Sequence, residues 1–384
     1  MNSIIHIIDI IFFTISTIGT VYIAIFTIAS LFPCKIYNPT NFKLKKIVIL
    51  FPVYKEADVI IQSILRFIKQ DYPKELYDII VIADNFPNSK IQELRNLPIK
   101  LLDVHFEKSS KALALNYAIN NIDKEYDIVI ILDADNEVNP SFLKEINKSY
   151  CTGNEYIQAH RLAANTDTNI AILDAVSEEI NNAIFRRGHN NIGLSSALIG
   201  SGMAFNFQWF KNNVSKLSTV GEDKELELIL HQDKKYIKYL NKTLVYDYKT
   251  KSSGAFHKQR RRWQAAQYQM FFRSVKNIIN NRSNLSMDIV DKLFQWIMPS
   301  RSMLLLFIII CTIVSPIISI DLVTKWCVLF IVYTICLLMA IPKRLYNKQL
   351  LQALIHIPYL SLLMFTNFFH LRSGSQKFIH TKHS

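Results

Sequence analysis

The stretch IVIILDAD, residues 128–135, decides the fold that we expect for this chain. Its first five residues form a short apolar run, which predicts a strand buried on both faces. In open sheets of parallel strands, ligands bind in the crevice outside the carboxyl ends of the strands. Asp133 and Asp135 stand at that point, and their carboxylates suit Mg²⁺ or Mn²⁺, because such hard cations take oxygen ligands. A solvated turn after a strand is the competing interpretation, because Asp-x-Asp is common by chance.

The segments before this stretch alternate between strand and helix patterns. Short links between parallel strands and helices predict a doubly wound, mostly parallel, Rossmann-like α/β sheet. Asp84 follows the strand before Asp133 and Asp135, so all three carboxylates are expected to converge on one cleft. The expected strands are 46–51, 77–83 and 128–132, and the expected helices are 57–70 and 109–122.

Composition limits the class of protein. The chain has 384 residues, a hydrophobic fraction of 50% and a formal net charge of +13, which fits a membrane protein with basic flanks better than a soluble domain. The five cysteines show no paired spacing, so we expect neither a disulfide framework nor a zinc site, and a cytosolic folded part. Nucleic acid is not an expected partner, because a cleft lined by carboxylates repels a polyanion.

The first apolar segment, Ile4–Phe32, is long enough to span a bilayer. It lacks a positively charged start and a small-residue cleavage site, so a removable signal peptide is not expected. Lys35 and Lys43 follow it, together with Lys45 and Lys46. By the positive-inside rule the N-terminus lies outside and the following domain in the cytoplasm, as in a multi-pass protein of the inner (plasma) membrane.

Three further apolar runs close the chain, at 303–320, 326–341 and 350–371. The first two predict a hairpin with an outer turn at Asp321–Lys325, so two to three C-terminal membrane helices are expected. The third run either spans or lies at the interface, and the basic residues after it favour the interfacial alternative. The expected division is an anchor (1–34), a catalytic domain (35–270), amphipathic interfacial helices (271–300), a membrane region (301–371) and a basic tail (372–384).

Residues 287–298 alternate apolar and polar side chains at helical spacing. Next to a membrane segment, this pattern indicates a helix that lies on the bilayer surface. The alternative is an ordinary helix that packs its apolar face on the globular domain.

Several short motifs recur in a fixed order along the middle of the chain. Together they resemble the membrane-bound inverting glycosyltransferases of family 2, which have a GT-A catalytic domain and include cellulose, chitin and hyaluronan synthases and ceramide glucosyltransferase. The resemblance covers about Lys43 to Trp263, and the tail Phe378–His383 is similar to the family's Trp/Phe-x-x-Thr-x-His ending. The motifs are Phe51–Glu56, Asp84, Asp133-Ala134-Asp135, Gly200–Phe205, Glu222-Asp223 and Gln259-Arg260-Arg261-Arg262-Trp263.

For the donor, the resemblance implies a nucleotide sugar, with a UDP-sugar as the first expectation, and Mg²⁺ or Mn²⁺ as the cofactor. Asp135 is then the more direct metal ligand, and Asp133 contacts the metal and the nucleotide. The implied nucleotide-binding residues are Tyr54, Glu56, Asp84, Lys111 and Asp133.

For the transfer, the resemblance implies that Asp223, beside Glu222, takes the proton of the acceptor hydroxyl. A helix N-terminus also favours such a pair through its dipole, and both roles are compatible. Arg260 and Arg262 are candidates for the diphosphate, because guanidinium binds phosphate bidentately. A patch for lipid headgroups is the alternative for this basic run. The implied diphosphate- and acceptor-side residues are Gln259, Arg260, Arg262, Trp263 and Gly202.

Some positions depart from the best-known members. Ala83-Asp84-Asn85 and Gln158–Arg161 are closer to a bacterial branch associated with exopolysaccharide synthesis, and Gly221 stands where Thr or Ser often precedes the Glu-Asp pair. We therefore expect transfer to a growing β-linked polysaccharide. Transfer of one sugar to a lipid is the alternative enzyme, and a basic membrane-anchored binding protein is the alternative outside catalysis.

Overall fold

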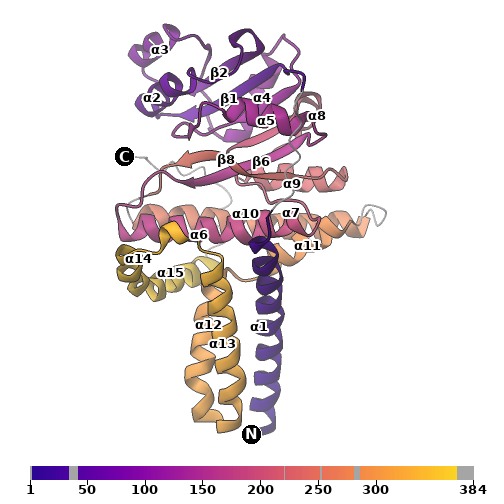
Figure 1. Cartoon of the computed structure of the whole chain (residues 1–384), viewed down its shortest axis with the longest axis vertical. Helices are drawn as coiled ribbons and strands as arrows, with labels where there is room; N and C mark the ends of the chain where they lie inside the picture. Colours follow the sequence, from indigo (N-terminus) through magenta and orange to yellow (C-terminus); the bar gives the residue numbers. More distant parts are fainter. Residues whose placement is uncertain (1, 34–41, 220, 251–252, 281–285, 370–384) are drawn as a thin grey trace.

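The computed structural model describes residues 2–33, 42–219, 221–250, 253–280 and 286–369. The predictions for Lys35 and for the tail at 378–383 lie outside these residues. A sheet domain lies at one end, a platform of helices crosses beneath it, and a stem of long helices extends from the platform (Figure 1).

The described strands form one eight-stranded sheet with the order β3-β2-β1-β4-β7-β6-β8-β5. Strands β1 to β4, β6 and β8 run in one direction, and β7 and β5 run against their neighbours, so the mostly parallel α/β fold is confirmed. The bounds are β1 Ile47–Tyr54, β2 Tyr77–Asp84, β3 Lys100–Val104, β4 Ile128–Ile131, β5 Glu137–Val138, β6 Tyr156–Ala163, β7 Met203–Asn206 and β8 Lys238–Asp247.

Helices cover both faces of this sheet, which explains the continuous apolar runs in its central strands. Along β1, Ile49 packs in the core beneath α2, α3 and α5, whereas Leu50 packs in the core beneath α4, α8 and α9. The Ser110 side chain accepts a hydrogen bond from Leu113 N and so begins α4. The bounds are α2 Ala57–Phe67, α3 Asn88–Arg95, α4 Lys111–Asn120, α5 Phe142–Tyr150, α8 Phe207–Asn213 and α9 Glu222–Gln232.

The platform consists mainly of α6, α10 and α11, with a π-helical turn that continues α6 (Figure 1). Helix α10 runs without interruption across residue 270, where the sequence predicted a boundary. The bounds are α6 Asn169–Asn181, η2 Asn182–Gly188, α7 His189–Asn191, α10 Ser253–Asn280 and α11 Met287–Ile297, and the short helices elsewhere are η1 Lys74–Leu76, η3 Val214–Lys216, η5 Lys343–Leu345 and η6 Leu354–His356.

Helix α11 turns its polar side toward the protein. Lys292 Nζ pairs with Glu227 Oε1 at 2.7 Å, and Asp288 Oδ1 accepts from Ser195 N at 2.7 Å. The apolar side chains of Met287, Val290 and Ile297 are exposed. An outward apolar stripe next to the stem fits a helix that lies on a bilayer surface.

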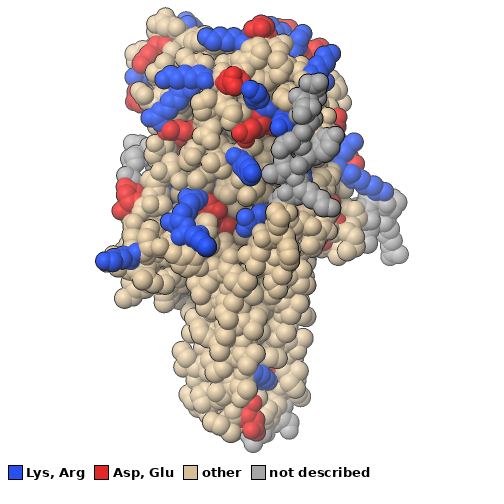
Figure 2. All heavy atoms as spheres, in the orientation of Figure 1, with Lys and Arg blue, Asp and Glu red and all other residues tan. Residues whose placement is uncertain are grey.

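The stem consists of α1 (Asn2–Leu31), α12 (Arg301–Ile318) and α13 (Ile320–Met339) (Figure 1). On the face shown in Figure 2 the stem carries few charged side chains, which lie near its free end. By length and apolar composition, four described helical segments are able to cross a membrane: these three and Lys348–Thr366. The predicted outer turn at Asp321–Lys325 is wrong, because the hairpin turns at Ser319 and those residues begin α13. There Lys325 Nζ and Trp326 Nε1 both bind the Asp9 carboxylate, which joins α13 to α1.

Helices α14 (Lys348–Ala353) and α15 (Ile357–Phe369) lie across the top of the stem, beneath the platform (Figure 1). Ile355 and Tyr359 are exposed there. This orientation fits the interfacial alternative for the third apolar run.

Candidate active site

One cavity of about 570 Å³ extends from the carboxyl ends of the central strands down to the stem helices. All the donor-side and acceptor-side residues predicted from the sequence line it, except Gly202. We call its sheet-side part the charged cleft, which is lined by residues of β1, β2, α4, α9 and the 133–135 turn. We call the part between α6, α10, α12, α13 and α15 the lower chamber.

Lys111 lies at the centre of the charged cleft. Its Nζ donates to Asp133 Oδ1 at 2.5 Å and to Gly200 O at 2.7 Å, and lies 3.5 Å from Glu222 Oε1. Burial works against the charged ammonium, but Asp133 and Glu222 outweigh it and raise the pKa of Lys111. The first residue of α4 therefore holds together carboxylates from two distant segments.

Asp84 and Asp135 are both buried at the mouths of their strands. Asp84 Oδ1 accepts hydrogen bonds from Asn85 Nδ2 at 2.7 Å and from Phe106 N at 3.2 Å, which fixes its carboxylate. Tyr54 and Glu56 line the same cavity from the end of β1. The sequence rule for carboxyl ends of parallel strands thus places these residues together, as predicted.

A polar network supports the turn that carries Asp133. Asn136 Oδ1 accepts from Asp133 N at 3.0 Å and also binds Ser201 Oγ. Gly202, next to Ser201, has φ of +64°, and a Cβ there would lie 2.9 Å from Val245 Cγ2. Gly202 therefore packs against β8 behind the cleft, and the cavity is lined instead by Gly200.

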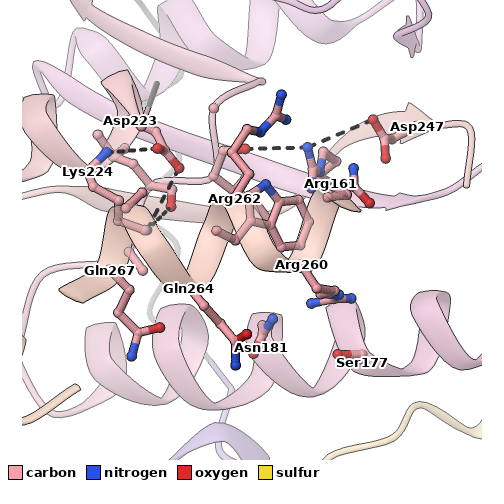
Figure 3. Close-up of a pocket in the computed structure, with 18 of the residues that line it drawn as sticks. Arg161, Ser177, Asn181, Asp223, Lys224, Asp247, Arg260, Arg262, Gln264 and Gln267 are labelled. Carbon is pink, nitrogen blue, oxygen red and sulfur yellow. Dashed lines mark hydrogen bonds and ion pairs between the residues drawn. The ribbon is translucent and has the colours of Figure 1, made fainter. Parts of the chain in front are cut away.

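Glu222 and Asp223 begin α9, where the helix dipole favours negative charge. Burial raises the pKa of Glu222 to about 7, and Asp223 adds to the rise while Lys111 opposes it. Asp223 Oδ1 accepts from Lys224 N at 2.8 Å, and both residues line the cavity (Figure 3). A Cβ at Gly221 would lie 2.7 Å from Ala266 Cβ, so glycine at this departure from the family pattern allows α9 to begin against α10.

The two candidate arginines of α10 point to opposite sides of that helix (Figure 3). Arg260 pairs with Asp174 of α6, and its guanidinium lies 4.7 Å from the Trp263 ring centroid and 4.8 Å from that of Phe256. Arg262 extends toward the charged cleft and makes no ion pair with any residue that the structure describes. Both arginines line the cavity, but of the two only Arg260 is engaged in an ion pair with a described residue.

A second charged network, which was not predicted from the sequence, lies at the edge of the cavity. Arg161 Nε donates to Glu178 Oε1 at 2.7 Å, and its Nη1 lies 3.8 Å from Asp247 Oδ1 (Figure 3). Lys249 Nζ binds both Glu178 and Asp247, at 2.7 Å from the latter. Burial opposes the charge on Asp247, but Arg161 and Lys249 lower its pKa. The Gln158–Arg161 pattern contained one member of this network, but its partners lie on other elements.

The lower chamber changes from polar to apolar away from the cleft. Ser177 and Asn181 of α6 face Gln264 and Gln267 of α10 (Figure 3). Arg301, the first residue of α12, donates from Nη2 to Ser177 O at 2.9 Å. The apolar lining beyond them comprises Leu305, Leu337, Ile357, Leu360 and Met364.

The carboxylates at the 133–135 turn suit a divalent cation. Among the described residues no group of three or more His, Cys, Asp or Glu side chains forms a complete metal cage. Mg²⁺ is usually bound by one or two carboxylates together with substrate phosphates, so Asp135 and Asp133 fit a cation shared with a bound diphosphate.

A family model and one solved structure agree with this architecture. The family model described as "Glycosyltransferase like family 2" matches residues 45–266. A mannosyltransferase from Pyrobaculum calidifontis, solved in complex with GDP-Man and Mn²⁺, is 14% identical with a TM-score of 0.51, and the match covers 87% of this chain and 99% of that chain. S. aureus TarS in complex with UDP-GlcNAc is 13% identical with a TM-score of 0.42, over 85% of this chain and 90% of that chain. No curated protein matches the chain.

Proposed function

The chain belongs to the glycosyltransferase-like family 2, and from this premise we propose a membrane-bound, metal-dependent, inverting transfer of a sugar from a nucleotide sugar to a lipid acceptor. The observation that carries the proposal is the single cavity that joins Asp223 in the charged cleft to the apolar lining between α12, α13 and α15.

The charged cleft supports the donor half of this proposal. Asp84, Tyr54 and Glu56 surround the place expected for the nucleoside, and Arg262 faces the place expected for the diphosphate. A bound Mg²⁺ or Mn²⁺ at Asp135 and Asp133 supplies positive charge that stabilises the leaving diphosphate. The guanidinium of Arg262 stabilises the same developing charge from α10.

Asp223 supports the transfer step. As the acceptor hydroxyl oxygen bonds to the anomeric carbon, its proton passes to the Asp223 carboxylate. The bond from the anomeric carbon to the diphosphate oxygen breaks on the opposite face, and the nucleoside diphosphate leaves with the electron pair. One displacement of this kind inverts the anomeric configuration.

The lower chamber decides our preference for a lipid over a growing polysaccharide. A sugar polymer needs a path lined with polar and aromatic groups, whereas the chamber ends in five apolar side chains from the stem and from α15: Leu305, Leu337, Ile357, Leu360 and Met364. Burial of an acyl or isoprenoid chain there gains about 0.8 kcal/mol for each CH₂ group. The polysaccharide synthase expected from the sequence remains the second candidate, supported by Trp263 in the cavity wall, because a flat aromatic face packs on sugar rings.

The test is an incubation of the full chain in nanodiscs with membrane lipid extract, Mg²⁺ or Mn²⁺, and a panel of UDP-sugars and GDP-mannose. We expect metal-dependent release of nucleotide with one donor and a labelled product that extracts into organic solvent with a single added sugar. The Asp223→Asn variant should bind the nucleotide but form no product. A long water-soluble product would replace the lipid proposal with polymer synthesis. Nucleotide release that does not depend on which donor is supplied would refute the proposed transferase.

A further inference from the structure

Arg301 differs from three other arginines of this protein in having no described carboxylate partner. Arg161, Arg260 and Arg344 each pair with an acidic residue of the platform or the sheet. Arg301 instead donates to Ser177 O at 2.9 Å and Ser177 Oγ at 3.4 Å, and no described carboxylate lies within 4.0 Å of it. Tyr333 Oη donates to Arg301 O at 2.9 Å and holds the start of α12 in place.

Arg186, in the π-helical turn that continues α6, repeats this feature in the lining of the same cavity. It is 3% exposed, and it donates to Asn182 Oδ1 at 2.6 Å and Ala197 O at 3.3 Å, again with no described carboxylate within 4.0 Å. A buried charge without a partner is costly, and burial lowers the pKa of Arg186 for this reason. Two guanidinium groups thus line one cavity, each with no described carboxylate within ion-pair distance.

The position of Arg301 indicates which anion neutralises it. It begins an apolar helix that is able to span a membrane, and a basic residue at the end of such a helix is expected at the level of the lipid headgroups. Basic pockets between membrane helices on the cytoplasmic side bind phosphate headgroups of lipids. Leu305, one turn further along α12, begins the apolar lining that continues with Leu337 and Leu360.

We propose that the lipid acceptor carries a phosphate group, which lies against Arg301 and Arg186 in the lower chamber. This inference rests on the proposed function and names the acceptor class. The lipid chain occupies the apolar lining between α12, α13 and α15. A hydroxyl on the head group beyond the phosphate extends past Asn181, Gln264 and Trp263 to Asp223. Isoprenoid phosphates that carry a sugar and glycerophospholipids such as phosphatidylglycerol both have this chemistry.

The test measures binding to the detergent-solubilised full chain with excess UDP and Mn²⁺, so that the donor site is filled. The charged probes are farnesyl-diphosphate-linked N-acetylglucosamine and dioctanoyl phosphatidylglycerol, and the neutral probes are farnesol and dioctanoylglycerol. At least one charged probe should bind about tenfold or more tightly than its neutral counterpart, because a charge-assisted contact is lost in the latter. The charged probe that binds identifies the source of the phosphate.

Variants separate the phosphate site from general damage. Arg301→Gln should remove the difference between charged and neutral probes, and Arg301→Lys should restore part of it. Arg344→Gln, a matched loss of an arginine outside the cavity, should keep the full difference. Equal binding of charged and neutral probes by the wild type, or wild-type preference in Arg301→Gln, would overturn the inference. If the wild type prefers the charged probe but turns over no nucleotide sugar, the proposed function alone would be overturned.

Discussion

The charged cleft and the lower chamber belong to one cavity but have opposite chemistry. The cleft gathers four carboxylates, Asp133, Asp135, Glu222 and Asp223, and three of them, all but Asp135, stabilise the charge of Lys111. The chamber gathers arginines without carboxylates and then apolar side chains. Because a metal and a diphosphate bring opposite charges to the cleft, its carboxylates suit a soluble donor, whereas the chamber suits an acceptor that enters from the membrane. Under the proposed function, this difference means that the two substrates reach the reaction from two directions.

The largest effect should come from the residue where the two regions meet. Asp223→Asn keeps the size of the side chain but removes the base, so the transfer rate should fall about 10²- to 10⁴-fold. Binding of UDP with Mn²⁺, measured by titration calorimetry, should change little. Asp233→Asn, at the other end of α9, is the matched control, because Asp233 binds Trp209 Nε1 outside the cavity. Transfer near the wild-type rate in Asp223→Asn would assign the base elsewhere.

The next effect concerns the donor side alone. Asp135→Asn removes one anionic oxygen from the proposed cation site, and we expect UDP binding in the presence of Mn²⁺ to weaken about 100-fold. Binding of the charged lipid probes should persist, because the lower chamber is unchanged. Asp103→Asn on β3 is the control outside the cavity. If the affinity for UDP with Mn²⁺ stays the same, the metal lies on other residues.

A pair of substitutions on α10 sharpens the comparison. Arg262→Gln should lower kcat by about 10² with little change in thermal stability, since it removes a donor to developing charge. Arg260→Gln should instead destabilise the fold by about 3 kcal/mol, because it leaves Asp174 buried without its partner. The measurements are initial rates and thermal unfolding in detergent. A reversal of the two phenotypes would mean that Arg260 is the diphosphate ligand.

The sequence predicted the charged cleft better than the lower chamber for a physical reason. Asp84, Asp133 and Asp135 end parallel strands, and that rule brings them together without knowledge of any contact. The sequence analysis also grouped Arg260 with Arg262 as candidates for the diphosphate. Residues i and i+2 of an α-helix point in directions about 200° apart, so only one of these two arginines faces the cleft. Helical periodicity alone contained that signal.

No comparable rule reaches the lower chamber. Arg301 and Ser177 are 124 positions apart, and they meet because α12 packs beneath α6. In the sequence, Arg301 reads as an ordinary basic flank of a membrane helix. The absence of a carboxylate beside it is a property of tertiary packing, and local patterns do not contain it.

The smallest effect tests how the cleft tolerates its crowded carboxylates. Burial raises the pKa of Glu222 from 4.5 to about 7, so the folded protein holds a proton that the unfolded chain has already lost in that pH window. The free energy of unfolding should therefore decrease as pH rises from about 4.5 to about 7. Glu222→Gln should flatten this slope in urea unfolding measured without metal or donor, whereas the exposed Glu93→Gln should keep it. Parallel slopes in Glu222→Gln and the wild type would mean that Lys111 neutralises Glu222 fully, and that the cleft carries its charges without cost to the fold.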